Sequence, residues 1–70
     1  MEIGNCVKEL RARNSWTQEK LAQASGVTRQ TIAALEKGDY IPSLLLALKI
    51  CEAFQLKMEE VFWLLKEEEK

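Results

Sequence analysis

Apolar positions recur with the period of an α-helix along almost the whole chain, and strand-like alternation is hard to find. Apolar residues at i, i+3, i+4 and i+7 share one side of a helix. The first predicted helix has such a stripe in Ile3, Cys6, Val7 and Leu10. We expect Asn14 to end this helix in the left-handed conformation. A fifth helix, over residues 58–66, has the same stripe in Met58, Val61, Phe62 and Leu65.

Three further helices are indicated by residues that begin and end helices. Ser and Thr side chains accept hydrogen bonds from the first free N–H groups of a helix, and Thr17, Thr28 and Ser43 stand at such positions. Gly26 and Gly38 can take the positive φ that follows a helix. The expected inner faces consist of Leu21, Ala22, Ile32, Leu35, Leu44, Ala47, Ile50, Cys51 and Phe54. The pattern predicts an all-α chain with five helices and short loops.

The size and composition describe one small domain over residues 1–70 without catalytic chemistry. The chain has 70 residues, 47% of them apolar, and a net charge of -1. It has no His, which removes the commonest acid/base group at neutral pH and the commonest metal ligand. Cys6 and Cys51 lie on apolar stripes far apart in the sequence, so we expect small buried hydrophobes and no metal site. We expect no cofactor and no enzyme.

No apolar run reaches the roughly 18 residues of a membrane span, and the first residues lack the pattern of a signal peptide. We therefore expect no membrane partner and a cytoplasmic location. The negative charge, taken alone, argues against nucleic acid as a partner.

The segment from Thr17 to Gly38 has the form of two short helices joined by a tight turn. Ala22 is small where the two helix axes would cross, and Gly26 permits the reversal. Ile32 and Leu35 would hold the second helix against the core. These features are typical of a helix-turn-helix unit, with a recognition helix over about residues 28–37.

The outer face of that predicted recognition helix has residue types that suit DNA. At 100° per residue, Arg29, Gln30, Ala33, Ala34 and Lys37 lie opposite the apolar side. Arg can bind guanine N7 and O6, Gln can bind adenine N6 and N7, and Ala can contact a thymine methyl group. Short polar side chains at helix N-termini could hold phosphates, namely Thr17, Gln18 and Thr28.

The chain resembles the Cro/phage-repressor helix-turn-helix family, also called the xenobiotic-response-element (XRE) type. The resemblance covers about residues 3–65 and rests on Thr17-Gln18, Leu21-Ala22, Gly26-Val27, Arg29-Gln30-Thr31-Ile32, Leu35-Glu36, Gly38, Pro42-Ser43-Leu44 and Ala47-Leu48-Lys49-Ile50. It implies a compact five-helix DNA-binding domain. It also implies a homodimeric transcriptional regulator that binds a palindromic operator in double-stranded DNA, and we expect this regulator to be a repressor.

The resemblance also assigns roles to single residues. Members of the family touch bases or phosphates at the positions of Gln18, Arg29, Gln30, Thr31 and Ala34, and the DNA backbone near Lys37. Arg11 and Glu36 fall where many members hold an ion pair, which has either a structural role or presents the Arg to a phosphate. Three positions depart from the pattern: Trp16 is larger than usual, and Gln55 and Lys57 are weak choices for helix-capping positions.

The predicted fifth helix has more apolar surface than one core face explains. On a helical wheel Trp63 lies about 150° from the inward stripe and Leu64 lies on its flank. We therefore predict a symmetric homodimer to which Trp63, Leu64 and Leu65 contribute. Scattered surface hydrophobes are the alternative explanation. A second hypothesis for function is an antitoxin-like protein-interaction module that binds DNA for autoregulation.

The net charge conceals a polarity along the sequence. Residues 1–37 contain six basic and four acidic residues, and the remainder contains four basic and seven acidic ones. The predicted DNA-binding part is thus the basic one, which fits a nucleic-acid partner.

Overall fold

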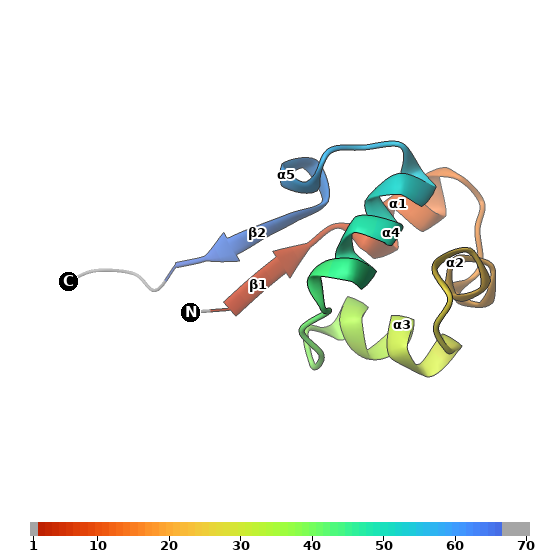
Figure 1. The fold of residues 1–70 in the computed structure, drawn as a ribbon, viewed down its shortest axis with the longest axis horizontal. Coiled ribbons are helices and arrows are strands. Elements are labelled where there is room, and N and C mark those ends of the chain that lie inside the picture. Colours follow the sequence, from red (N-terminus) through yellow and green to blue (C-terminus); the bar gives the residue numbers. More distant parts are fainter. Residues whose placement is uncertain (1, 67–70) are drawn as a thin grey trace.

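Residues 2–66, which the computed structural model describes, form five helices and a two-stranded sheet (Figure 1). In chain order the elements are β1 (Glu2–Asn5), α1 (Val7–Arg13), α2 (Gln18–Ser25), α3 (Arg29–Lys37), α4 (Leu44–Phe54), α5 (Met58–Val61) and β2 (Phe62–Leu65). The helices form a compact body, and β1 and β2 project from it as an antiparallel ribbon. The predicted five-helix, helix-turn-helix fold is confirmed.

The ribbon corrects the prediction at both ends of the chain. The fifth helix ends at Val61 instead of continuing to residue 66, and Ile3 belongs to a strand instead of the first helix. Glu2 pairs with Leu65, and Asn5 pairs with Phe62. This pairing joins segments from opposite ends of the sequence, so the local hydrophobic pattern contains no sign of it.

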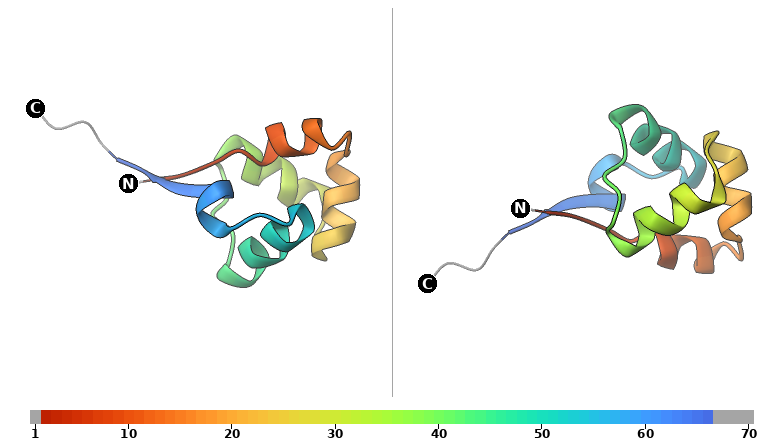
Figure 2. Two further views of the ribbon diagram at one scale, coloured as in Figure 1. Left: turned by 90° about the horizontal axis from the view of Figure 1, so that it is seen from above. Right: turned by 90° about the horizontal axis from the view of Figure 1, so that it is seen from below.

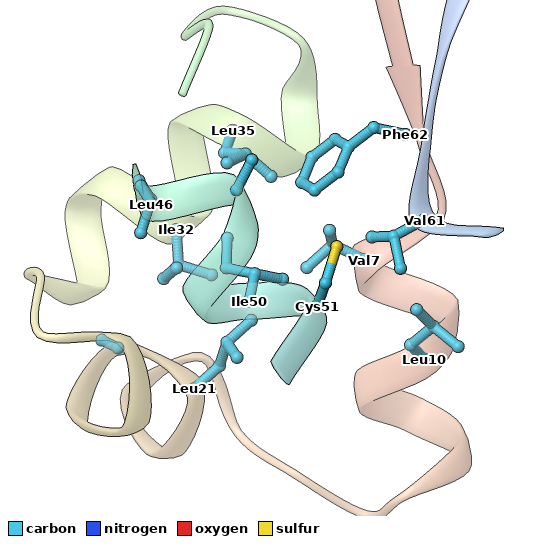
Figure 3. Packing of buried hydrophobic residues seen from close by; sticks show 12 residues of the cluster. Val7, Leu10, Leu21, Ile32, Leu35, Leu46, Ile50, Cys51, Val61 and Phe62 are labelled. Carbon is cyan, nitrogen blue, oxygen red and sulfur yellow. The ribbon is translucent and has the colours of Figure 1, made fainter. Parts of the chain in front are cut away.

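The core lies between the helices and the base of the ribbon (Figure 3). Its buried apolar residues are Val7, Leu10, Leu21, Ala22, Ile32, Leu35, Leu46, Ala47, Ile50, Cys51, Val61 and Phe62. Ile3, Cys6, Phe54 and Met58 pack against this cluster and are partly buried.

Two residues predicted to face the core are exposed. Leu44 is 70% exposed, because the inner stripe of α4 includes Leu46, which is 5% exposed, and leaves Leu44 outside it. Leu65 is 45% exposed, because β2 extends beyond the helices.

The helix caps largely follow the prediction. The hydroxyls of Thr17, Thr28 and Ser43 accept hydrogen bonds from the backbone N–H groups of Lys20, Thr31 and Leu46, at 3.0, 3.2 and 3.1 Å. Gly26 and Gly38 have φ of 76° and 86°.

The less favourable capping positions are accommodated in different ways. After α1 the left-handed residue is Ser15, with φ 59°, whereas Asn14 has φ -95° and its side chain donates to the Leu10 carbonyl at 2.8 Å. Gln55 ends α4 in the left-handed conformation, with φ 58° and ψ 43°. Before α5, the Glu60 carboxylate accepts a hydrogen bond from the Lys57 backbone N–H at 2.8 Å.

Both cysteines are free thiols that contribute to packing. Cys51 is buried, and Cys6 is half-buried and donates to the Glu60 carbonyl at 3.3 Å. Burial raises the pKa of both thiols above the ordinary value. A raised thiol pKa lowers the thiolate fraction at neutral pH, which fits a packing role. Within the described part of the chain, none of the helices is long and apolar enough to cross a membrane.

Candidate nucleic-acid interface

Helices α2 and α3 form the predicted helix-turn-helix unit. The turn is closed by a hydrogen bond from the Val27 N–H to the Ala22 carbonyl at 3.0 Å, with Gly26 in the left-handed conformation. The buried Ser25 hydroxyl donates to the Leu21 carbonyl at 2.6 Å, which satisfies its polar atom inside the turn. Helix α3 lies along the lower edge of the body in Figure 1, where no other described element covers its outer side (Figure 2).

The core fixes which side of α3 faces outward. Ile32 and Leu35 are fully buried, so the opposite side of the helix must face away from the protein. Arg29, Gln30 and Lys37 are exposed. Thr31, Ala33 and Ala34 are half-buried. Gln30, Ala33, Ala34 and Lys37 thus lie on the outward side of α3, and Arg29 and Thr31 lie on its two flanks.

The remaining predicted contact residues lie at the N-termini of the two helices. Thr17 and Thr28 are exposed, and their hydroxyls cap α2 and α3. The Thr28 and Thr31 hydroxyl oxygens are 3.1 Å apart and share a hydrogen bond. Both helix starts therefore combine exposed hydroxyl groups with the positive end of a helix dipole.

An ion-pair network joins the three helices around this unit. The Arg11 guanidinium contacts the Glu36 carboxylate twice, through Nε–Oε2 at 2.5 Å and Nη2–Oε1 at 3.1 Å. Arg11 Nη1 also donates to the Trp16 carbonyl at 2.9 Å, and Gln18 Nε2 donates to Glu36 Oε1 at 3.1 Å. Glu36, on α3, thus accepts hydrogen bonds from α1 and α2. The network holds the recognition helix in position, and it uses the side-chain amide of Gln18.

Three contacts near the site were not predicted from the sequence. The rings of Trp16 and Phe54 stack with centroids 5.1 Å apart, and Lys20 Nζ lies 5.7 Å from the centroid of Trp16. Asn5 Nδ2 donates to the Leu35 carbonyl at 3.1 Å, which ties β1 to the C-terminal part of α3. The size of Trp16 was a signal of different packing in its loop. The local sequence gives no signal for the contact of Asn5.

The three residues predicted at a dimer interface do not share one face. Because side chains alternate along a strand, Trp63 and Leu65 lie on one face of the ribbon and Leu64 lies on the other. All three are exposed, by 43%, 45% and 60%.

Comparisons with known proteins agree with this geometry. A sequence model of the helix-turn-helix family matches residues 7–61. The chain is 71% identical over 63 residues to the HTH-type transcriptional regulator YgzD of Bacillus subtilis. The aligned region covers 90% of this chain and 96% of YgzD. The chain is also 33% identical over 57 residues to the antitoxin HipB of Escherichia coli, with 81% of this chain and 61% of HipB covered.

Among solved structures, the restriction-modification controller protein C.AhdI of Aeromonas hydrophila superimposes with a TM-score of 0.73. The two chains are 33% identical, and the match covers 77% of this chain and 82% of that one. The family match and these relatives agree with the prediction that the chain is not an enzyme. The chain belongs to the Cro/C1-type, or XRE, family of helix-turn-helix transcriptional regulators.

Proposed function

We propose that this protein is a sequence-specific regulator that inserts α3 into the major groove of double-stranded DNA. The observation that carries this proposal is the outer side of α3, where Arg29 and Gln30 are exposed at the N-terminal end. An α-helix fits the major groove, and these side chains can form two hydrogen bonds each with guanine and adenine edges. Thr31 would contact a neighbouring base or phosphate, and Ala33 and Ala34 leave room for close approach of the helix.

Phosphate contacts would set the position of the protein on the duplex. Thr17, Gln18 and Thr28 lie at the starts of α2 and α3, where helix dipoles and free amide groups favour a negative charge. Lys37, exposed in the last turn of α3, would contact the DNA backbone at the other end of the helix. Arg11 is held by Glu36, so its main role is structural, with a phosphate as a further possible partner.

The protein would act as a homodimer and repress transcription by occupying a palindromic operator. A single recognition helix reads only a few base pairs, and helix-turn-helix proteins read two half-sites about one DNA turn apart as dimers. β2 exposes three apolar residues, namely Trp63, Leu64 and Leu65, and one face of this strand would be buried in such an assembly. Occlusion is the simplest mechanism, since the described residues form one compact body around the DNA-binding unit.

The test is selection of bound sequences from a random duplex pool, followed by affinity measurements on Arg29→Ala. We expect this change to cost about 1–3 kcal/mol and to relax the preference at one base pair. Arg13→Ala is the matched control, because Arg13 is an exposed arginine on α1 and its loss changes the net charge equally. If Arg29→Ala and Arg13→Ala have the same effect on the preferred sequence, α3 does not read the bases as proposed.

A second candidate function is that of an antitoxin-like module that binds a protein partner and regulates its own synthesis. The similarity to the antitoxin HipB favours this candidate. The discriminating measurement is co-purification of the natively expressed chain. A stoichiometric protein partner that covers α4 or α5 would support the antitoxin function.

A further inference from the structure

The face of the ribbon that carries Leu64 borders an apolar groove. The groove has a volume of about 310 Å³, and its described lining consists of Ile3, Pro42, Leu44, Ala47, Met58 and Phe62. Leu64 is paired with Ile3 across the ribbon and therefore lies on the same face. Leu44 and Leu64 are 70% and 60% exposed. A hollow and a protruding apolar side chain thus lie side by side on this face.

On the opposite face of the ribbon, Trp63 and Leu65 contact the backbone of the neighbouring strand. A Cβ atom added at Gly4 would lie 2.9 Å from Trp63 Cε2 and 3.0 Å from Leu65 Cδ2. These two side chains therefore lie directly over the Gly4 backbone, which leaves them only partly exposed. Trp63 and Leu65 pack on their own ribbon and are 43% and 45% exposed, whereas Leu64 is 60% exposed.

We propose that Leu64 of one copy enters the groove of a second copy, and that the second copy does the same in return, across a two-fold axis. This inference rests on the proposed function, which needs a dimer, and it assigns the dimer contact to one face of the ribbon. The contact excludes Trp63 and Leu65. An exchange of this kind is self-complementary, as a two-fold interface requires.

The direction in which α3 faces favours contact through a face of the ribbon. The strands show their faces in Figure 1 and are nearly edge-on in Figure 2, and α3 lies along the lower edge of the body. Both recognition helices of a dimer must face the same DNA, so the two-fold axis must run vertically in Figure 1. Antiparallel pairing of the two β2 strands through their free edges needs a two-fold axis perpendicular to the faces of the ribbon. That axis would place α3 of the second copy on the side away from the DNA. Packing face on face keeps both helices on one side.

The exposed apolar residues on this side of the molecule supply part of the surface that a dimer interface needs. Leu44, Leu48 and Leu64 are each at least half exposed, and Leu48 follows Leu44 by one turn of α4. Together they expose roughly 300 Å² of apolar surface, which is the lower end of the range for the largest apolar patch on a typical monomer, a patch that is often functional. A standard interface buries about 800 Å² per partner, of which about 500 Å² is apolar. The half-buried groove residues Ile3, Pro42 and Met58 add to this apolar surface. The described lining carries no charge, so a second copy meets no like charge there.

The experiment compares neighbouring residues on opposite faces of one strand. Sedimentation equilibrium is measured for the wild-type chain, for Leu64→Lys and for Leu65→Lys, with circular dichroism to verify folding. We expect a wild-type dimer at tens of micromolar. Leu64→Lys should weaken dimerisation by about tenfold or more, because it places a charge in the apolar groove. Leu65→Lys, with the same change in charge and composition, should leave the dimer intact.

Two further measurements test the groove directly and separate dimerisation from DNA binding. Leu44→Lys changes the groove itself and should also dissociate the dimer. Binding to a duplex with a single half-site reports on α3 alone, so Leu64→Lys should retain the affinity that the wild-type monomer has there. Dissociation by Leu65→Lys with an intact Leu64→Lys dimer would overturn the assignment, as would a wild-type chain that stays monomeric. Neither of these two results bears on the affinity of α3 for a half-site. The proposed function would be overturned by a different result, namely half-site affinity that does not change in Arg29→Ala.

Discussion

Two kinds of side chain surround α3: those that face outward from the helix, and those that join it to neighbouring helices. Helical periodicity alone predicts that Gln30 lies opposite Ile32, and the structure has both Gln30 and its neighbour Arg29 exposed. The hydrogen bond from Gln18 to Glu36 joins two helices, and so does the stacking of Trp16 on Phe54. Which side chains of different helices meet depends on how whole helices pack. The resemblance to the family implied only one of these contacts, the ion pair Arg11–Glu36.

The change Glu36→Gln tests how much the ion pair of Glu36 with Arg11 stabilises the fold. Glu36 is largely buried and neutralises Arg11, so the amide would leave a partly buried guanidinium without a counter-charge. We expect the free energy of unfolding, measured with urea, to fall by about 2–4 kcal/mol. Glu19→Gln is the control, because Glu19 is exposed and its carboxylate accepts only a 3.3 Å bond from Gln23. Equal effects of the two changes would show that the network around Glu36 contributes little.

At the scale of elements, the helix-turn-helix unit was predictable and the ribbon was not. Thr17, Gly26, Thr28 and Gly38 act within a few residues of their own position, so their capping roles follow from the local sequence. The segment 62–65 fits the stripe of a helix as well as a strand. Its pairing with residues 2–5 decides between the two, and that pairing becomes visible only in three dimensions.

The left-handed residue at the end of α4 offers a site for stabilising the protein. Gln55 adopts the left-handed conformation, which costs a residue with a Cβ about 1–2 kcal/mol relative to its preferred conformations and costs glycine almost nothing. Gln55→Gly should therefore raise the free energy of unfolding by about 0.5–1 kcal/mol, less than the full cost because glycine also gains freedom in the unfolded chain. Thermal unfolding followed by circular dichroism would measure it. Gln55→Ala should lack this gain, and an equal gain from Ala would show that the backbone conformation is not its cause.

At the scale of the whole molecule, the distribution of charge fits the proposed orientation on DNA. From Lys8 to Lys37, the part that contains α1, α2 and α3, six basic residues stand against three acidic ones. The ion pair of Arg11 with Glu36 neutralises one charge of each sign. The acidic residues Glu59 and Glu60 belong to α5, at the upper edge of the body in Figure 1, and Glu52 lies in the last turn of α4, whereas α3 lies along the lower edge. A chain with a net charge of -1 can therefore present a positive side to a duplex.

This polarity makes the salt dependence of DNA affinity a test of orientation. Each phosphate contact by a Lys or Arg releases condensed counterions, and the logarithm of the affinity falls with the logarithm of salt concentration by about 0.9 per contact. Lys37→Gln should weaken binding to all sequences alike and reduce the slope by about one. Lys57→Gln removes the same charge from an exposed lysine next to α5, on the side away from α3, and should leave the slope unchanged. Fluorescence anisotropy with a labelled duplex over about 50–200 mM salt measures both slopes. If the two variants lower the slope equally, binding follows net charge and not the side on which α3 lies.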